Sequence, residues 1–409
     1  MGDGVHQSTR GRIYVDRALP GDVVEAKIYK AGGLLRGDIT RLVETSPQRV
    51  DAPCRHYADC GGCTLQHASE DFYRAWKTDV VRSALEREGL TPGTWQAPIF
   101  LPPGQRRRVT FAASKKKQSV QLGFFRRRTH HVTDISACLI ADPAIMDLRK
   151  QLMPWLASIL QDGKPVDVFI QIVDGQREVV VTGPIGKKGR PDLQVYESAA
   201  ALAQTAKIAR IAWRPREHVD AEIVLEVNPL LVKFGALSVA LPPLAFLQPT
   251  KAGEDALVSG VMAALPKKGK FADLFSGCGT FAGAMLARGT VDAYEVSSVA
   301  VGALNKSKGP LPLTVHQRNL FDNPLAPDEA KRYDAVVFDP PRTGALAQAT
   351  ALAASDVPLV VGVSCNPITF ARDARLLVEG GYKLESVQVI DQFTWSYHVE
   401  LVAAFTKSA

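Results

Sequence analysis

The sequence lacks the features of a membrane or secreted protein. No apolar run in the chain reaches the roughly 20 residues needed to span a bilayer. The N-terminal residues form no apolar signal segment, so we expect a cytoplasmic protein. The chain also lacks a complete dinucleotide-binding fingerprint and a P-loop lysine motif, which argues against a nicotinamide cofactor and a Walker-type nucleotide site.

Cysteine is scarce, with six residues in the chain. In a cytoplasmic protein of this size, such a set is more typical of metal binding or catalysis than of disulfides. Four of the thiolates would suit zinc or an iron–sulfur cluster. Structural zinc sites usually have two close pairs, so an isolated fourth cysteine favours iron–sulfur, while a mixed zinc site with His56 or His67 stays an alternative. The candidate ligands are Cys54, Cys60, Cys63 and Cys138.

Acidic residues are missing from residues 101–130, which contain nine Lys or Arg. The whole chain has a milder excess, with 49 Lys and Arg against 42 Asp and Glu. Runs at 109–113 and 120–125 separate the basic triplets and predict paired strands, with the lysine triplet in the connecting turn. A face of one sign suits phosphate contacts, so we favour nucleic acid over a merely solvated surface. The basic residues are Arg106, Arg107, Arg108, Lys115, Lys116, Lys117, Arg126, Arg127 and Arg128.

Length and pattern divide the chain into domains, because 409 residues are too many for one core. Residues 1–46 alternate strand-like runs with Pro-Gly and Gly-Gly turns, which predicts a small barrel of the oligonucleotide-binding sort or another small β-domain. We assign residues 47–71 and 100–240 to a central α/β domain. Residues 72–99 contain a helix expected to pack on the C-terminal domain, which comprises residues 241–409.

An amphipathic helix is predicted over residues 70–88. Phe72, Trp76, Val80 and Leu85 recur at helical spacing, and Gly89 ends the pattern. We therefore expect these apolar side chains to form the buried face of the helix.

Strand–helix alternation from about residue 255 predicts a doubly wound α/β domain. Residues 271–275 read as a strand, 276–280 as a glycine loop and 281–287 as a helix. Glycines allow a ligand to approach the backbone closely at a helix N-terminus. A second strand at 291–294 ends in Glu295, an acid placed to accept hydrogen bonds from ribose hydroxyls. Loop and acid together favour S-adenosylmethionine over NAD.

Cys365 is a candidate nucleophile because of its place between two predicted elements. It follows an apolar strand at 359–363 and precedes a helix at 368–378. That strand end is where α/β sheets bind ligands, and a helix N-terminus can stabilise a thiolate. The alternative is a free cysteine that packs in the core.

Two acids accompany this cysteine in the sequence pattern. Asp339 follows a predicted strand at 335–338. Glu400 lies within a mostly apolar run at 398–402, where burial would raise its pKa. The alternative for Glu400 is the solvent-facing side of an edge strand.

Several short motifs occur together along the chain, and their joint presence and order make the pattern specific. On these motifs the chain resembles the RNA uracil-5-methyltransferases, specifically the ribosomal RNA branch, over almost its whole length. The motifs are the cysteine set described above, Phe246-Leu247-Gln248-Pro249, residues 273–280 (DLFSGCGT), Asp339-Pro340-Pro341-Arg342, Ser364-Cys365-Asn366-Pro367 and His398-Val399-Glu400.

The resemblance implies a Rossmann-like class I methyltransferase domain, an N-terminal TRAM domain and a [4Fe-4S] cluster on the four cysteines. It implies S-adenosylmethionine as methyl donor and 23S ribosomal RNA as substrate, and we expect the protein to act as a monomer. Because the tRNA branch of the family generally lacks the cluster and the TRAM domain, ribosomal RNA is preferred over tRNA. The residues implied to bind S-adenosylmethionine are Gln248, Phe275, Thr280, Glu295, Asn319 and Asp339.

The resemblance also assigns the reacting groups. Cys365 falls on the family's nucleophile and Glu400 on its general base, and Asp339 is assigned a role in orienting the uracil or the cysteine. Thr280 stands where the family commonly has Asn, and residues 393–397 depart from the usual Pro-His-Thr approach to the base. These departures leave every reacting group in place.

The implied chemistry requires both a nucleophile and a base. C5 of uracil becomes nucleophilic only after a thiolate adds to C6, and a base must then remove the C5 proton. The uracil must also leave its stack to reach the pocket. Two rival functions remain, an exocyclic-amine RNA methyltransferase, which needs no thiol, and a non-catalytic iron–sulfur RNA-binding protein.

Overall fold

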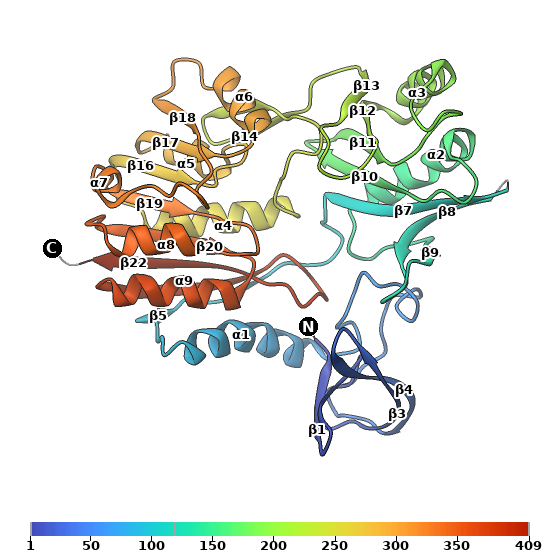
Figure 1. Cartoon of the computed structure of the whole chain (residues 1–409), viewed down its shortest axis with the longest axis horizontal. Coiled ribbons are helices and arrows are strands. Elements are labelled where there is room, and N and C mark those ends of the chain that lie inside the picture. The colour runs from blue at the N-terminus through green and yellow to red at the C-terminus, as the bar shows by residue number, and fades with distance from the viewer. Residues whose placement is uncertain (1, 118, 408–409) are drawn as a thin grey trace.

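The computed structural model describes residues 2–117 and 119–407, whose strands form four sheets (Figure 1). The methyltransferase-like domain, coloured yellow to red, lies beside a central domain coloured cyan and green, and the N-terminal strands, coloured blue, lie below the central domain. Within the described residues, no helix combines the length and the apolar character that a membrane crossing requires.

The N-terminal sheet has four strands in the order β1-β2-β4-β3. Three of them match the strand-like runs of the sequence, whereas β1 was not predicted. No pairing of β1 with β3 closes the sheet among the described strands, so the barrel stays a prediction. The strands are β1 (Gly4–Ser8), β2 (Gly11–Val15), β3 (Val23–Ala31) and β4 (Leu34–Glu44).

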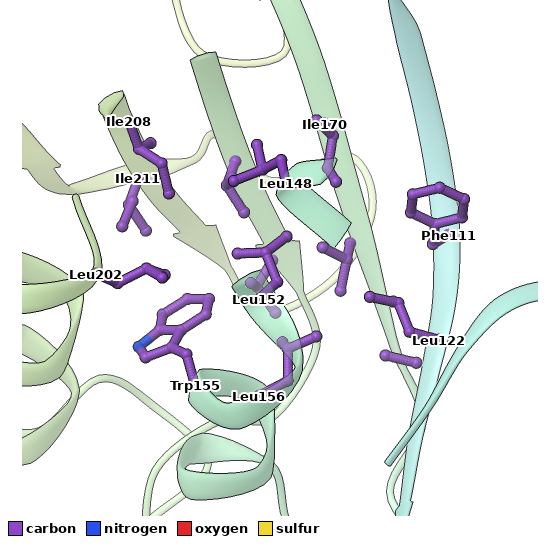
Figure 2. Close-up of a cluster of buried hydrophobic side chains, with 14 of the residues drawn as sticks. Phe111, Leu122, Leu148, Leu152, Trp155, Leu156, Ile170, Leu202, Ile208 and Ile211 are labelled. Atoms are coloured by element: carbon purple, nitrogen blue, oxygen red, sulfur yellow. The ribbon is translucent and has the colours of Figure 1, made fainter. Parts of the chain in front are cut away.

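The central domain contains a seven-stranded sheet in the order β13-β12-β11-β10-β7-β8-β9. Helices α2 (Pro143–Ile159) and α3 (Leu193–Ala206) pack against it, and Figure 2 shows Leu148, Leu152 and Trp155 of α2 facing the sheet. The strands are β7 (Arg108–Lys116), β8 (Ser119–Phe125), β9 (Val132–Asp134), β10 (Val166–Val173), β11 (Gln176–Thr182), β12 (Ile208–Arg214) and β13 (Glu222–Glu226). The predicted pairing of the two basic strands is confirmed, since β7 and β8 are antiparallel neighbours.

The C-terminal domain is built on a nine-stranded sheet in the order β18-β17-β16-β19-β20-β22-β21-β5, with β6 also on β21. The five neighbouring strands β18, β17, β16, β19 and β20 are parallel, and β22 pairs with β20 in the antiparallel direction. Its elements after α4 are β16 (Gly269–Leu274), α5 (Thr280–Met285), β17 (Gly289–Glu295), α6 (Ser298–Ser307), β18 (Leu313–Gln317), α7 (Pro327–Ala330), β19 (Ala335–Phe338), α8 (Leu346–Ala353), β20 (Leu359–Ser364), α9 (Pro367–Glu379), β21 (Tyr382–Asp391) and β22 (Glu400–Lys407).

Helix α1 (Glu70–Arg87) packs against α9 and β21 of this domain. Its chain then adds two short strands, β5 (Thr94–Trp95) and β6 (Ile99–Phe100), to the edge at β21. The predicted buried face is right for Leu85, whereas Phe72, Trp76 and Val80 are half-buried. The fully buried face of the helix consists of Tyr73, Lys77, Val81 and Leu85. Because this face contains a lysine, a prediction based on apolar residues did not identify it.

A hairpin of β14 (Leu231–Phe234) and β15 (Leu237–Ala240) shares its core with α4 (Lys251–Ala264), α5 and the nine-stranded sheet. Two backbones touch here, because a Cβ on Gly235 would lie 2.3 Å from the carbonyl oxygen of Gly283. The packing therefore joins the hairpin, which precedes the boundary predicted at residue 241, to the core of the nine-stranded sheet.

Candidate active site

Three candidate reacting groups meet at the carboxyl edge of the parallel strands. Asp339 follows β19 and Cys365 follows β20, and these two strands are parallel neighbours. Glu400 begins β22, which runs antiparallel to β20 and starts at the same edge. Ser364 lies opposite Leu401 in these strands, and Cys365 directly follows the first of these paired residues while Glu400 directly precedes the second.

Glu400 faces the protein interior and not solvent. Its residue is 4% exposed, and Gln392 Nε2 donates to its Oε1 at 3.4 Å. The same amide nitrogen donates to Gln248 Oε1 at 2.7 Å, and Gln248 Nε2 donates to Asp339 Oδ2 at 3.4 Å. Two buried amides thus connect the two acids, and the alternative of a solvent-facing Glu400 is excluded.

Burial raises the pKa of each candidate reacting group in the site. Burial, reinforced by the charge of Asp339, raises the pKa of Glu400 well above its usual value. Burial raises the pKa of Asp339 to about 7. Burial and the two neighbouring carboxyls raise the pKa of Cys365 to about 11. The expected stabilisation of a thiolate by the N-terminus of α9 is therefore outweighed in the ligand-free protein.

The residues implied to bind S-adenosylmethionine line the same edge in strand order. Asn319, Glu295, Phe275 and Asp339 follow or end β18, β17, β16 and β19, which are successive neighbours in the sheet. Thr280 begins α5. Gln248 reaches the edge through its bond to Asp339.

The glycine loop after β16 is held by the acid at the end of β17. Gly277 and Gly279 have φ angles of +54° and +92°, in the left-handed region that favours glycine. Gly277 N donates to Glu295 Oε2 at 2.9 Å, and Ser297 N donates to Glu295 Oε1 at 2.8 Å. The carboxylate therefore organises the loop and keeps lone pairs available for further donors.

Sequence reasoning missed Gln392, which joins Gln248 to Glu400. A lone glutamine carries no motif, so no signal in the sequence identified it. The structure shows an indirect constraint at Gly253 in the first turn of α4, where an added Cβ would lie 2.2 Å from Gln392 Oε1. A residue larger than glycine would displace the amide.

The four predicted cluster ligands line one cavity of about 290 Å³. Burial raises the pKa of Cys63 to about 12 and also raises the pKa of Cys60 and Cys138. In the described part of the chain, no group of three or more His, Cys, Asp or Glu is arranged to hold a metal ion. Of the two histidines weighed for zinc, His67 lies 2.6 Å from Tyr57 Oη and His56 lies 3.1 Å from Ser136 Oγ.

The first basic triplet is not an open phosphate-binding face. Arg107 is buried, donates to Glu254 Oε2 at 2.6 Å and donates to the Gln248 carbonyl at 3.0 Å. Arg108 lies over the ring of Phe246 at 4.1 Å, and Arg106 lines the cysteine cavity. This triplet therefore joins the central domain to the candidate active site.

The third triplet is also matched by acids that are distant in sequence. Arg126 pairs with Asp59 at 2.8 Å. Arg127 pairs with Asp16, and Arg128 lies 3.6 Å from Asp3 and 3.7 Å from Asp38. All three arginines of this triplet thus have an acid nearby that is distant in sequence.

The lysine triplet differs from the two arginine triplets. Lys116 and Lys117 are exposed, whereas Lys115 Nζ donates to the Ala157 carbonyl at 2.6 Å. Of the nine basic residues, Lys116 and Lys117 are thus the ones that are exposed to solvent at the tip of the β7–β8 hairpin.

Comparisons with known proteins identify the family that this chain resembles. A family model described as tRNA (Uracil-5-)-methyltransferase matches residues 327–407, which include all three candidate reacting residues. An uncharacterized RNA methyltransferase of Brucella suis is 38% identical over 99% of this chain and 95% of its own length. The 23S rRNA (uracil(1939)-C(5))-methyltransferase RlmD of Halomonas elongata is 30% identical over 98% of this chain and 86% of its own length.

A solved structure supports the fold of nearly the whole chain. Pyrococcus abyssi tRNA (uracil-54, C5)-methyltransferase, in complex with S-adenosyl-L-homocysteine, matches with a TM-score of 0.73 at 22% identity. The match covers 96% of this chain and 95% of that one, and it supports the predicted α/β methyltransferase class.

Proposed function

The chain belongs to the RNA uracil-5-methyltransferase family, and from that membership we propose that it methylates C5 of a uridine in 23S ribosomal RNA with S-adenosylmethionine. The observation that carries the proposal is the placement of Cys365 and Glu400 beside the paired residues Ser364 and Leu401 at the carboxyl edge of the sheet. An exocyclic-amine methyltransferase would need no thiol there. A non-catalytic RNA-binding protein would need neither group.

Cys365 acts first. Its thiolate adds to C6 of the flipped uracil, the S–C6 bond forms, and the electron pair moves to C5 and O4 as an enolate. C5 then takes the methyl group that S-adenosylmethionine supplies. Because the Cys365 thiol keeps its proton in the ligand-free protein, formation of the thiolate belongs to the substrate-bound state.

Glu400 acts after methylation, when C5 carries both a methyl group and a proton. Its carboxylate removes that proton, the C5–C6 double bond re-forms and the S–C6 bond breaks, which frees Cys365. Burial makes Glu400 a stronger base than a carboxylate in water, because its pKa is raised. Asp339, which is joined to Glu400 through Gln248 and Gln392, orients the uracil or the cysteine.

The carboxyl edge of β16 to β19 suits S-adenosylmethionine. Gly277 and Gly279 leave the backbone open to close approach, and Glu295 has lone pairs for the ribose hydroxyls. Gln248, Phe275, Thr280, Asn319 and Asp339 complete the proposed set. This order along one sheet edge supports the proposal.

Cys54, Cys60, Cys63 and Cys138 are proposed to hold a [4Fe-4S] cluster. All four thiols line one cavity of about 290 Å³, and Gly62 N donates to Cys60 Sγ at 3.4 Å, as backbone amides do to cluster sulfurs. Nothing in the uracil chemistry requires an electron. The cluster therefore has a structural or RNA-positioning role.

Ribosomal RNA is the proposed substrate because of the similarity to RlmD over most of both chains. The N-terminal sheet, proposed as a TRAM domain, and the tip of the β7–β8 hairpin would contact phosphates and 2′-hydroxyls. A tRNA is the alternative substrate. We further propose that the protein acts in the cytoplasm as a monomer.

In vitro methylation tests this function. Purified protein and methyl-labelled S-adenosylmethionine are incubated with 23S rRNA, 16S rRNA and tRNA prepared from cells that lack the protein. We expect label in 5-methyluridine at a defined position of 23S rRNA, identified by nuclease digestion and mass spectrometry. Label confined to tRNA would overturn the choice of RNA, and label on an exocyclic amine would overturn the reaction.

A further inference from the structure

Lys77 of helix α1 is fully buried, although lysine is among the residues least often found inside proteins. It comes from outside the sequence of the C-terminal domain and reaches the segment 391–398 that leads into Glu400. A buried charge is costly unless it is paired and hydrogen-bonded. The hydrogen-bond partners of Lys77 therefore indicate the role of its charge.

All three donors of the Lys77 ammonium group are used on this segment. Nζ donates to Asp391 Oδ1 at 2.8 Å, to the Phe393 carbonyl at 3.3 Å and to the His398 carbonyl. Its contacts thus bracket the turn from Gln392 to Val399 at both ends. Glu400 follows two residues after the last of them.

Tyr73, one helical turn before Lys77, holds the middle of the same segment. Its hydroxyl donates to Asp391 Oδ2 and accepts from Trp395 N at 2.9 Å. Trp395 has a φ of +56°, a strained conformation for a large side chain, so neighbouring contacts must enforce it. Gln392, which bonds to the Glu400 carboxyl, lies inside the bracketed turn.

We propose that Lys77 is a positioning residue for the general base. Its ammonium group fixes the turn 392–399 and thereby sets the Glu400 carboxyl and its Gln392 partner against the uracil C5. The inference rests on the proposed function, because it takes Glu400 as the base that acts after methyl transfer. Anchoring of α1 by itself would not need the charge, since Val81 and Leu85 already pack in the core of that domain.

The rates of adduct formation and adduct release distinguish a positioning role of Lys77 from general structural support. Formation of the Cys365–C6 adduct needs the nucleophile, whereas its release needs a well-placed Glu400. A misplacement of about 1 Å in a catalytic group can cost about 100-fold in rate. Loss of Lys77 should therefore slow adduct release far more than adduct formation.

The experiment measures both steps in single turnovers with a uridine-containing 23S rRNA fragment. The variants are Lys77→Met, the double variant Lys77→Met/Asp391→Asn, which leaves no unpaired buried charge, and the milder Tyr73→Phe. Arg210→Met is the matched control, because it breaks an equally buried ion pair, with Glu178 in the central domain, away from the turn. Thermal melting and circular dichroism establish folding of each variant.

We expect the Lys77 variants to form the methylated adduct within about 3-fold of the wild-type rate and to release it about 10- to 100-fold more slowly. Tyr73→Phe should shift release in the same direction by less, and Arg210→Met should leave the ratio of the two rates unchanged. Equal losses in both steps, in a folded Lys77 variant or in Tyr73→Phe, would assign a merely structural role. If the wild-type protein forms no adduct even with 5-fluorouridine RNA, the proposed function fails, and that result is distinct from the failure of Lys77 as a positioning residue.

Discussion

Cys365 directly follows Ser364, the last residue of β20, and Glu400 directly precedes Leu401, the residue of the antiparallel neighbour β22 that pairs with Ser364. Neighbouring strands are about 4.8 Å apart, so side chains at such positions can reach adjacent atoms of one small ring. The proposed nucleophile for C6 and the proposed base for the C5 proton are thus 35 positions apart in sequence. The arrangement predicts that the two residues act on different steps.

Replacement of Glu400 by Gln should trap the reaction after methyl transfer. The amide keeps the shape of the side chain and loses the base, so Cys365 can still add and C5 can still be methylated. We expect a protein–RNA adduct that carries labelled methyl and survives denaturing electrophoresis. Cys365→Ala should form no adduct and transfer no methyl. Release of 5-methyluridine by Glu400→Gln at the wild-type rate would show that another group is the base.

Replacement of Asp339 by Asn should make Cys365 more reactive at mildly alkaline pH. Burial first, and then the charges of Glu400 and Asp339, raise the pKa of the thiol to about 11. Removal of one negative neighbour stabilises the thiolate, lowers this pKa and increases the thiolate fraction at pH 8. Alkylation by iodoacetamide, followed on the Cys365 peptide by mass spectrometry, should therefore be faster in the variant.

The wild-type alkylation rate should keep rising with pH toward about 11. Cys365→Ala identifies the peptide and is the control for the other cysteines. Slower alkylation of Asp339→Asn than of the wild-type protein would show that Asp339 does not oppose the thiolate.

Arg107 should contribute to stability and not to the salt dependence of RNA binding. Loss of one partner of its buried pair with Glu254 leaves an uncompensated charge, so Arg107→Met should cost about 3 to 5 kcal/mol in the free energy of unfolding. The double variant Lys116→Ala/Lys117→Ala, at exposed positions of the hairpin tip, should leave the free energy of unfolding nearly unchanged. Denaturant titration measures both.

The same lysine variant tests the binding of RNA phosphates by the hairpin tip. Each lysine that binds a phosphate contributes about one to the slope of log affinity against log salt, so loss of both should reduce the slope by about two. A filter-binding series across salt concentrations gives this slope. An unchanged slope would mean that Lys116 and Lys117 belong to a solvated surface.

Arg127 should hold the N-terminal sheet on the central domain through its pair with Asp16, whose side chain is also mostly buried. Arg127→Asp should loosen this contact, and the charge swap Arg127→Asp/Asp16→Arg should restore it in part. Limited proteolysis between residues 44 and 54 reports the docking. Cleavage at the wild-type rate in the single variant would show that other contacts hold the sheet.

The four cysteines should yield a brown protein when it is purified without oxygen. We expect iron and sulfide at about four each per chain, and an absorbance that disappears in Cys138→Ser, because cubane clusters are held by four thiolates. Cys278→Ser is the matched control, since Cys278 is buried away from the cavity. Colourless protein with one zinc per chain would establish the alternative.

The sequence by itself determined most of the C-terminal domain. Alternation of apolar runs with glycine and proline located β19, β20 and α9 to within two residues, since a strand buried on both faces must be apolar along its length. The end of such a strand is also a chemical position, so Cys365 and Asp339 could be assigned to the ligand-binding edge before their neighbours were known.

Only the tertiary structure decided what the charged residues do. The acid-free stretch 101–130 predicts an open basic face, yet Arg107 and Arg127 meet Glu254 and Asp16 from other domains. Lys77 interrupts the apolar stripe of its helix because it pairs with Asp391, which lies more than 300 positions away in sequence. The local sequence pattern predicts which apolar residues are buried, because the hydrophobic effect is non-directional and needs no particular partner. The pairing of a charged residue depends instead on which distant acid the fold brings next to it.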